Sequence, residues 1–337
     1  MARRPTAQDV ADLAGVSRSS VSLVLNGRGD GNIAAVKQQA IVEAARQLNY
    51  RPNALALSLR SQRTWTVGVL TWQGALGFPQ RLLHAAGETA AAGGYLSILM
   101  DMGVGHVYEP RAVTSLLDRQ VDAFLVVAPE LVEFRPPEAI LGTPTVLVNC
   151  IDPEHHVTSI VPDEFGAALV AAQILIDHGH RRIGLLTDDA PTAQVRERVA
   201  GVHAAMASAG LAPPVLWAGA GEIQHGAALA RDALSGSSAP TGLVCVHERL
   251  ALGAVLAAAQ LGLSIPEDLS VVSLEDGEYL AADLVPPLTT VQRPDRAMAE
   301  QAVLTLMRKV AGAETEIRQL SFVCPPDLRA STGPAPA

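Results

Sequence analysis

Residues 6–27 read TAQDVADLAGVSRSSVSLVLNG, and this stretch predicts two short helices joined by a tight turn. Thr6 is a good cap for the first helix, because Asp9 follows at the three-residue spacing of a capping box. Gly15 can end that helix, since glycine readily takes the left-handed conformation of a helix C-terminus. Ser17 can then cap the second helix. The stretch therefore predicts a helix–turn–helix.

Each of the two helices is expected to have an apolar and a polar face. The inward residues are expected to be Val10, Leu13 and Ala14 in the first helix and Val21, Val24 and Leu25 in the second. The outward residues of the second helix are then Arg18, Ser19, Ser22 and Leu23. Short polar side chains with one arginine suit insertion in a DNA major groove. A helical hairpin with a solvated face would show the same pattern, so both interpretations stay open.

A third helix is expected from about Ile33 to Leu48, with Asn32 as its cap. Pro52 interrupts the chain after it, because proline cannot continue a helix. Residues 54–59 are too few to hold a helix alone in water, yet too apolar for a plain linker. They are expected either to form a short helix against a partner or to pack on the rest of the chain.

Charge is unevenly distributed over the 337 residues. The first 63 residues carry nine basic and four acidic side chains, a net charge of +5, whereas the remainder carries −14. A small basic segment on a large acidic one is typical of a polyanion-binding module attached to another domain. With 49% hydrophobic residues, the chain can bury a real core, which excludes wholesale disorder.

The sequence lacks the patterns that are typical of membrane proteins, secreted proteins, enzymes and metal-binding proteins. No apolar stretch reaches the roughly 18 residues of a membrane span, and the first residues lack the apolar core of a secretory signal, so a cytoplasmic protein is expected. No dinucleotide fingerprint, P-loop or nucleophile elbow occurs, so we expect neither an enzyme nor a bound cofactor. The histidines lack metal-site spacing. Cys150, Cys245 and Cys324 are expected to be buried, unpaired residues.

From residue 64 on, strand-length apolar segments alternate with helical patterns in two series. The first series runs from Thr66 to Asn149 and the second from Ser159 to Leu274. Strands rich in Val, Ile and Leu that alternate with helices predict parallel sheets covered on both faces. Two series predict two similarly built lobes. Ligands of such folds bind beyond the carboxyl ends of the strands, so the cleft between the lobes is the expected binding site.

Several motifs resemble the lactose/galactose-repressor (LacI/GalR) family of transcriptional regulators. The headpiece motifs are Asp9-Val10-Ala11, Ala14-Gly15-Val16-Ser17, Val21-Ser22, Val24-Leu25-Asn26-Gly27 and Asn49-Tyr50-Arg51-Pro52-Asn53-Ala54-Leu55-Ala56. The motifs of the effector domain are Gly179–Ile183, Arg198–Gly201, Ala251–Ala254, Ile265–Asp268 and Pro286–Val291. The resemblance covers nearly the whole chain.

The resemblance implies a small all-α helix–turn–helix headpiece and an α/β effector domain of two parallel-sheet lobes, built like a periplasmic binding protein. The headpiece would span 1–50, the hinge helix and linker 51–63, and the effector-binding and dimerisation domain 64–332. Lobe 1 would take about 64–160 and 293–322, and lobe 2 about 161–292 and 323–332. The three crossovers would fall near Ile160–Asp163, Val291–Pro294 and Phe322–Pro325, and 333–337 would form a disordered tail.

For DNA, the resemblance implies that Arg18 and Ser19 read the major groove, with Ser22 and Leu23 nearby. Thr6, Ser17 and Asn26 match positions that hold phosphates, which fix register rather than sequence. In the hinge segment the implied contacts come from Asn53, Ala56, Leu59 and Arg60, with Leu59 as a wedge in the minor groove. The family usually has arginine where Leu23 and Leu57 stand, so the outer bases of the operator are expected to differ from the common pattern.

For the effector, the resemblance points to Arg198, which matches an arginine that grips a sugar hydroxyl or a carboxylate. Asp163 matches a polar position on the first crossover. His247 and Glu275 replace the family's usual asparagine and aspartate. Trp72, Phe78 and Trp217 would supply an aromatic platform, although simple packing is an equal alternative for the two tryptophans. Arg198 and Glu275 are expected to face one another across a ligand, with His247 and Asp163 near.

Together these features predict a ligand-responsive repressor. It would bind a pseudo-palindromic operator as a homodimer or a larger assembly such as a tetramer. A small molecule, in the family most often a sugar, would bind in the interlobe cleft. A corepressor-dependent regulator with a non-sugar effector and a plain small-molecule binding protein are the alternatives.

Overall fold

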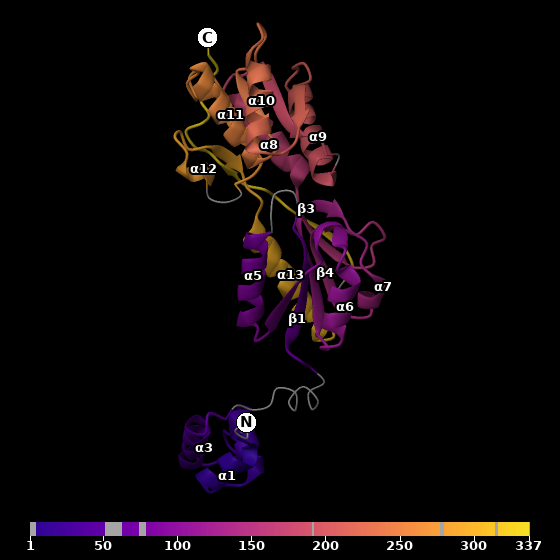
Figure 1. The fold of residues 1–337 in the computed structure, drawn as a ribbon, viewed down its shortest axis with the longest axis vertical. Helices are drawn as coiled ribbons and strands as arrows, with labels where there is room; N and C mark the ends of the chain where they lie inside the picture. Colours follow the sequence, from indigo (N-terminus) through magenta and orange to yellow (C-terminus); the bar gives the residue numbers. More distant parts are fainter. Residues whose placement is uncertain are drawn as a thin grey trace. The chain divides into compact units, whose positions relative to one another are not determined.

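The computed structural model describes residues 5–50, 63–73, 79–190, 192–276, 280–313 and 316–336. They form two compact units, Met1–Trp65 and Thr66–Ala337, which we call the headpiece and the body (Figure 1). The hinge residues Asn53, Ala56, Leu59 and Arg60 and the aromatic residue Phe78 lie outside the described residues.

The headpiece consists of α1 (Ala7–Ala14), α2 (Arg18–Leu25) and α3 (Ala35–Gln47). The hydroxyl of Thr6 accepts from the backbone N–H of Asp9, and the carboxylate of Asp9 accepts from the N–H of Thr6 at 2.7 Å, which completes the capping box. Gly15 ends α1 in the left-handed conformation, with a φ of 65°, and Ser17 caps α2. The predicted helix–turn–helix is therefore confirmed.

Two details of the headpiece differ from expectation. Its core is formed by Val10, Ala11, Val21, Ile41, Ala44 and Ala45. Leu13 was expected inside but is 52% exposed, because the buried stripe of α1 passes through its neighbours Val10, Ala11 and Ala14. Asn32 does not cap the third helix, which has Ala34 at that position; its amide instead donates to the carbonyl of Arg28 at 3.2 Å.

The body contains two six-stranded sheets. The lobe 1 sheet has the order β11-β5-β4-β3-β1-β2, and its strands are β1 (Thr66–Thr71), β2 (Leu96–Asp101), β3 (Ala123–Glu133), β4 (Thr145–Ile151), β5 (Thr158–Pro162) and β11 (Gln319–Phe322). The lobe 2 sheet has the order β12-β10-β9-β8-β6-β7, and its strands are β6 (Ile183–Asp188), β7 (Val215–Gly219), β8 (Gly242–Cys245), β9 (Ser270–Ser273), β10 (Thr289–Val291) and β12 (Pro326–Asp327). Every pair is parallel except β10 with β12. The predicted two-lobed α/β class is confirmed.

Helices cover both faces of the lobe 1 sheet (Figure 1). The lobe 1 helices are α5 (Gln80–Ala92), the 3-10 turn η1 (Val104–His106), α6 (Glu109–Leu117), α7 (Glu138–Leu141) and α13 (Asp295–Val310). α5 packs on α13 over one face, and α6 and α7 cover the other. α13 was not predicted from the sequence; it comes from the far end of the chain yet shares the core of β1, β3 and β4.

Lobe 2 is built in the same manner around one apolar core. Its helices are α8 (Glu164–Asp177), α9 (Ala193–Ser208), α10 (Ile223–Leu234), α11 (Glu248–Leu261) and α12 (Leu280–Asp283). α8 packs on α9, and α10 packs on α11. Because strands and helices alternate, a connection to the next helix follows the carboxyl end of most strands. Ligands of such folds bind at these connections.

The chain passes between the lobes after β5, after β10 and after β11. The connections lie side by side, because the N–H of Asp163 donates to Phe322 at 2.8 Å and the N–H of Gln292 donates to Pro325 at 2.9 Å. Close spacing of these strands places the carboxyl ends of the two sheets next to one another.

The tail after Ser331 is held by lobe 2, so our expectation of disorder is corrected for residues 333–336. Gly333 donates to the hydroxyl of Ser270 and accepts from His180, both at 3.1 Å, and the N–H of Ala335 donates to His178 at 2.9 Å. The reason is that His180 and Ser270 are buried, and the tail backbone satisfies their polar atoms.

Candidate functional site

The outward face of α2 carries the predicted base-reading residues. Arg18 and Ser19 are exposed, and Ser22 and Leu23 are half-buried. Ser19 shares a hydroxyl hydrogen bond of 2.8 Å with Ser17. The face thus offers one cation, two hydroxyls and one branched apolar group to a groove.

The predicted phosphate contacts lie at helix ends. Thr6 and Ser17 cap α1 and α2, where free backbone N–H groups and the helix dipole favour an anion. The amide of Asn26 donates to the carbonyl of Ser22 and, at 3.2 Å, to its hydroxyl. A phosphate held by Asn26 would have to replace one of these two bonds.

A buried cluster of charged residues lies at the carboxyl ends of the lobe 2 strands. Arg198 on α9 donates through Nε and Nη2 to the carboxylate of Glu164, at 2.6 and 3.1 Å. Through Nη1 it donates to the carbonyl of Val246 and, at 3.0 Å, to Glu275. Each nitrogen of the guanidinium is therefore already bonded to a protein oxygen.

His247 completes this cluster between two carboxylates. Its Nδ1 lies 3.3 Å from Glu275 and its Nε2 lies 3.5 Å from Asp188. Burial opposes the charged imidazolium, but the carboxylates of Glu275 and Asp188 outweigh it and raise the pKa of His247 to about 9. Burial likewise opposes the charge of Glu275, yet His247 and Arg198 hold its pKa well below the usual range. His247 is therefore a cation at neutral pH.

Side chains from both lobes meet at this cluster. The amide of Gln194 donates to Glu275 and accepts from the N–H of Leu131 on β3 of lobe 1, both at 2.9 Å. Arg293 donates to the carbonyl of Pro129 at 3.1 Å. Glu130 faces the same charges from lobe 1, and burial raises its pKa. Movement of one lobe against the other would change these contacts.

The structure corrects how Arg198 and Glu275 are related. We expected them to face one another across a ligand, but they are in direct contact at 3.0 Å. Asp163 is the N-cap of α8, and its carboxylate accepts from the N–H of Gly166 at 2.8 Å. His247 does lie beside Glu275, as expected.

The two predicted aromatic residues that the structure describes lie apart from one another. Trp72 follows β1 and stacks on Phe134 at 5.7 Å, with the His106 ring edge-on at 4.4 Å. Trp217 does not supply a platform at the cleft. Its ring packs near Gly184 and Pro240, towards the amino ends of β6 and β8, because β7 is an edge strand whose side chain covers the core there.

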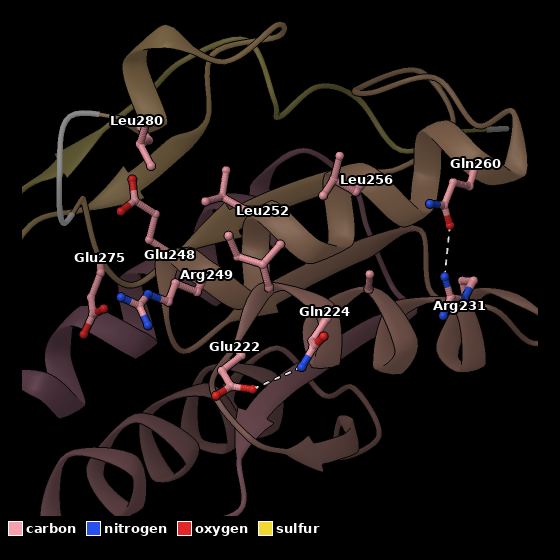
Figure 2. A pocket seen from close by; sticks show the side chains of 12 residues that line it. Glu222, Gln224, Arg231, Glu248, Arg249, Leu252, Leu256, Gln260, Glu275 and Leu280 are labelled. Atoms are coloured by element: carbon pink, nitrogen blue, oxygen red, sulfur yellow. Dashed lines mark hydrogen bonds between the residues drawn. The ribbon is translucent and has the colours of Figure 1, made fainter. Parts of the chain in front are cut away.

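A groove of about 880 Å³ runs between α10 and α11 (Figure 2). Glu275 and Leu280 lie at one end, and Arg231 and Gln260 are hydrogen-bonded at the other. The walls include the apolar side chains of Ile223, Leu252 and Leu256. This groove was not predicted from the sequence, since residues of two helices meet there only after folding.

Sequence reasoning also missed Glu164, Asp188, Glu130 and Gln194. Asp188 ends β6 and Glu164 follows β5 by two residues, so their position near a strand end was a usable signal, whereas Glu130 lies within β3. Nothing in the sequence around Gln194 indicated its role, because the N–H group that it accepts from belongs to Leu131 in the other lobe.

The cysteines, the possible metal ligands and the apolar character of the helices add no further candidate site among the described residues. Burial raises the pKa of all three cysteine thiols, to about 12 for Cys324, so the expectation of buried cysteines is confirmed. Within the described ranges, no set of three His, Cys, Asp or Glu side chains is placed to hold a metal ion. None of the described helices combines the length and apolar character needed to cross a bilayer.

A helix–turn–helix unit followed by a two-lobed domain with a polar interlobe site defines a DNA-binding regulator with a ligand-binding domain. Residues 6–53 match the bacterial regulatory proteins of the lacI family, and residues 172–332 match a periplasmic binding protein-like domain. The HTH-type transcriptional repressor PurR of Vibrio cholerae serotype O1 (strain M66-2) is 32% identical, over 93% of this chain and 94% of that protein. The chain belongs to the lacI family of bacterial regulatory proteins.

Solved structures agree with this assignment. The Lac repressor bound to ONPG in its repressed state is 25% identical, with a TM-score of 0.81 over 98% of this chain and 100% of that one. The complex of the transcriptional regulator CelR with cellobiose is 26% identical, with a TM-score of 0.68 over 97% and 100%. Both the headpiece and the body are therefore shared with ligand-bound regulators.

Proposed function

We propose that this protein is a transcriptional repressor that binds a pseudo-palindromic operator as a homodimer and is controlled by a sugar or sugar-like metabolite in the interlobe cleft. The observation that carries the proposal is Gln194, which joins the backbone of lobe 1 to Glu275 within the charged cluster of lobe 2. A ligand that engages Glu275 competes for that bridge, and so acts on the relation between the lobes. On this proposal the protein works in the cytoplasm and catalyses no reaction.

The chemistry of the cluster supports a ligand rich in hydroxyl groups. All three nitrogens of the Arg198 guanidinium already donate to protein oxygens, whereas the carboxylates of Asp188 and Glu275 keep 13% and 19% of their side-chain surface exposed. Carboxylates accept hydrogen bonds and repel anions. The similar regulators CelR and Lac repressor are bound to cellobiose and to ONPG in their solved structures, which supports the sugar class. A non-sugar effector would have to supply similar donors.

Exposed apolar side chains support the homodimer. One edge strand of each lobe presents two of them, Leu96 and Leu99 on β2 and Val215 and Leu216 on β7. Exposed apolar edge strands are rare on monomers, because they invite pairing. A pseudo-palindromic site also needs two headpieces. Sedimentation equilibrium tests this, and a monomer at micromolar concentration would contradict it.

The effector site is tested by operator binding with a screen of neutral sugars. Operator DNA is selected from a random pool with the full-length protein and labelled. Fluorescence anisotropy then measures its binding in the presence and absence of each sugar. Glu275→Gln should still bind operator but lose the response to the sugar that acts on the unmodified protein. Glu197→Gln, an exposed position on the same helix as Arg198, is the matched control and should keep both properties. An unaltered response in Glu275→Gln would remove Glu275 from the site.

A further inference from the structure

Leu23 is an apolar residue on the polar face of α2. The partly buried apolar side chains that pack against the described headpiece core include Val24 and Leu25 of this helix, but not Leu23. Val21 lies in the core itself and is 1% exposed. Because successive residues of a helix are 100° apart, Leu23 is directed away from the stripe that its neighbours form.

No apolar neighbour on α2 accompanies Leu23 on this face. One turn before it stands Ser19, whose hydroxyl is bonded to Ser17, and one turn after it stands Gly27, which has no side chain. Arg18, exposed at the start of the helix, is the nearest charged residue of the same face. Leu23 is half-buried but is not among the side chains that pack on the headpiece core, so part of its apolar surface stays open on this face.

We propose that Leu23 recognises the 5-methyl group of a thymine in each operator half-site. This inference rests on the proposed operator binding by α2. Leucine has no donor or acceptor, and the one apolar group that the four bases present in the major groove is the methyl group of thymine. Arg18 recognises a different base by hydrogen bonds. Five residues at 1.5 Å rise separate the two side chains, so the thymine lies within about two base pairs of the base that Arg18 contacts.

The test begins with operators selected by the full-length protein from random DNA. Each conserved thymine of the half-site is then replaced by deoxyuridine, which removes only the methyl group and keeps base pairing. At one position the affinity should fall about fourfold for one half-site and about fifteenfold for both, as expected when one buried methyl group is lost from each. The same replacement at the other thymines should change little.

Two variants assign the effect to the side chain. Leu23→Ala should bind the thymine and deoxyuridine operators equally. Leu13→Ala removes the same side chain from the exposed face of α1 and should keep the full discrimination. Because neither leucine is part of the headpiece core, both variants should fold, and circular dichroism checks this.

The outcomes separate this inference from the proposed function. A palindrome with no conserved thymine, or equal affinity of the unmodified protein for both operators, overturns the role of Leu23 and leaves operator binding intact. Discrimination that survives in Leu23→Ala also overturns it. Failure to enrich any sequence would reject operator recognition itself, and with it the role of Leu23.

Discussion

Arg198 and Glu164 form a two-point ion pair inside lobe 2, with Nε and Nη2 at 2.6 and 3.1 Å from the two carboxylate oxygens. Their side chains are only 1% and 2% exposed. The pair joins the start of α8 to the first half of α9. Arg198 therefore stabilises the packing of α8 on α9, and this structural role does not require a ligand.

Replacement of Arg198 by alanine should destabilise the body by roughly 3–5 kcal/mol, because Glu164 would remain buried without its partner. Urea denaturation followed by circular dichroism measures this. Arg196→Ala, which removes an arginine that is 59% exposed on the same helix, should cost less than about 1 kcal/mol. A loss for Arg198→Ala no larger than that of Arg196→Ala would show that the buried pair is not structural.

The stability of the body should depend on pH through His247. The pKa of His247 is about 9 in the folded protein against 6.5 for an ordinary histidine, because Glu275 and Asp188 outweigh burial and the repulsion of Arg198. The stabilisation is fully present below pH 6.5 and is lost as the pH rises through 9. Thermal unfolding between pH 6 and 10 measures the fall. His247→Asn should flatten the curve in this window; an unchanged slope would assign the fall to other groups.

Removal of residues 1–63 should abolish operator binding and leave a folded body. The division of the structure at Trp65 and the +5 charge of the first 63 residues support this expectation. Gel-shift and circular dichroism measurements on the truncated chain test the two parts separately. Retardation of the operator by the truncated protein would place DNA affinity in the body.

Arg18→Ala should relax base preference, whereas Asn26→Ala should weaken binding to all sequences alike. One lost bidentate contact to a base is worth about 1–3 kcal/mol of discrimination. Asn26 instead caps α2 by bonds to Ser22, so its loss disturbs the helix end whatever the base sequence. Affinities on operator and random DNA separate the two cases. Equal losses on both DNAs for Arg18→Ala would mean that Arg18 contacts only phosphate.

Much of the fold could be predicted from local signals. The capping box at Thr6, the left-handed Gly15 and the cap at Ser17 were all read correctly, because each depends on residues within one turn of chain. The strands β1 to β9 were predicted because their apolar stretches are continuous, whereas the short strands β10, β11 and β12 were not predicted. The predictions that Leu13 is buried and that the tail is disordered were wrong. Both depend on contacts with segments that are distant in the sequence.

The sequence by itself determined the helix–turn–helix, the two α/β series, the charge division and the resemblance to a regulator family. All of these features depend on residues that are close together along the chain, or on short motifs. Only the tertiary structure decided what Arg198 does, since its carboxylate partners, Glu164 and Glu275, are 34 and 77 residues away in sequence. It also turned Trp217 away from the cleft. Burial and charge pairing act through space, and chain order alone does not specify which groups will share one low-dielectric site.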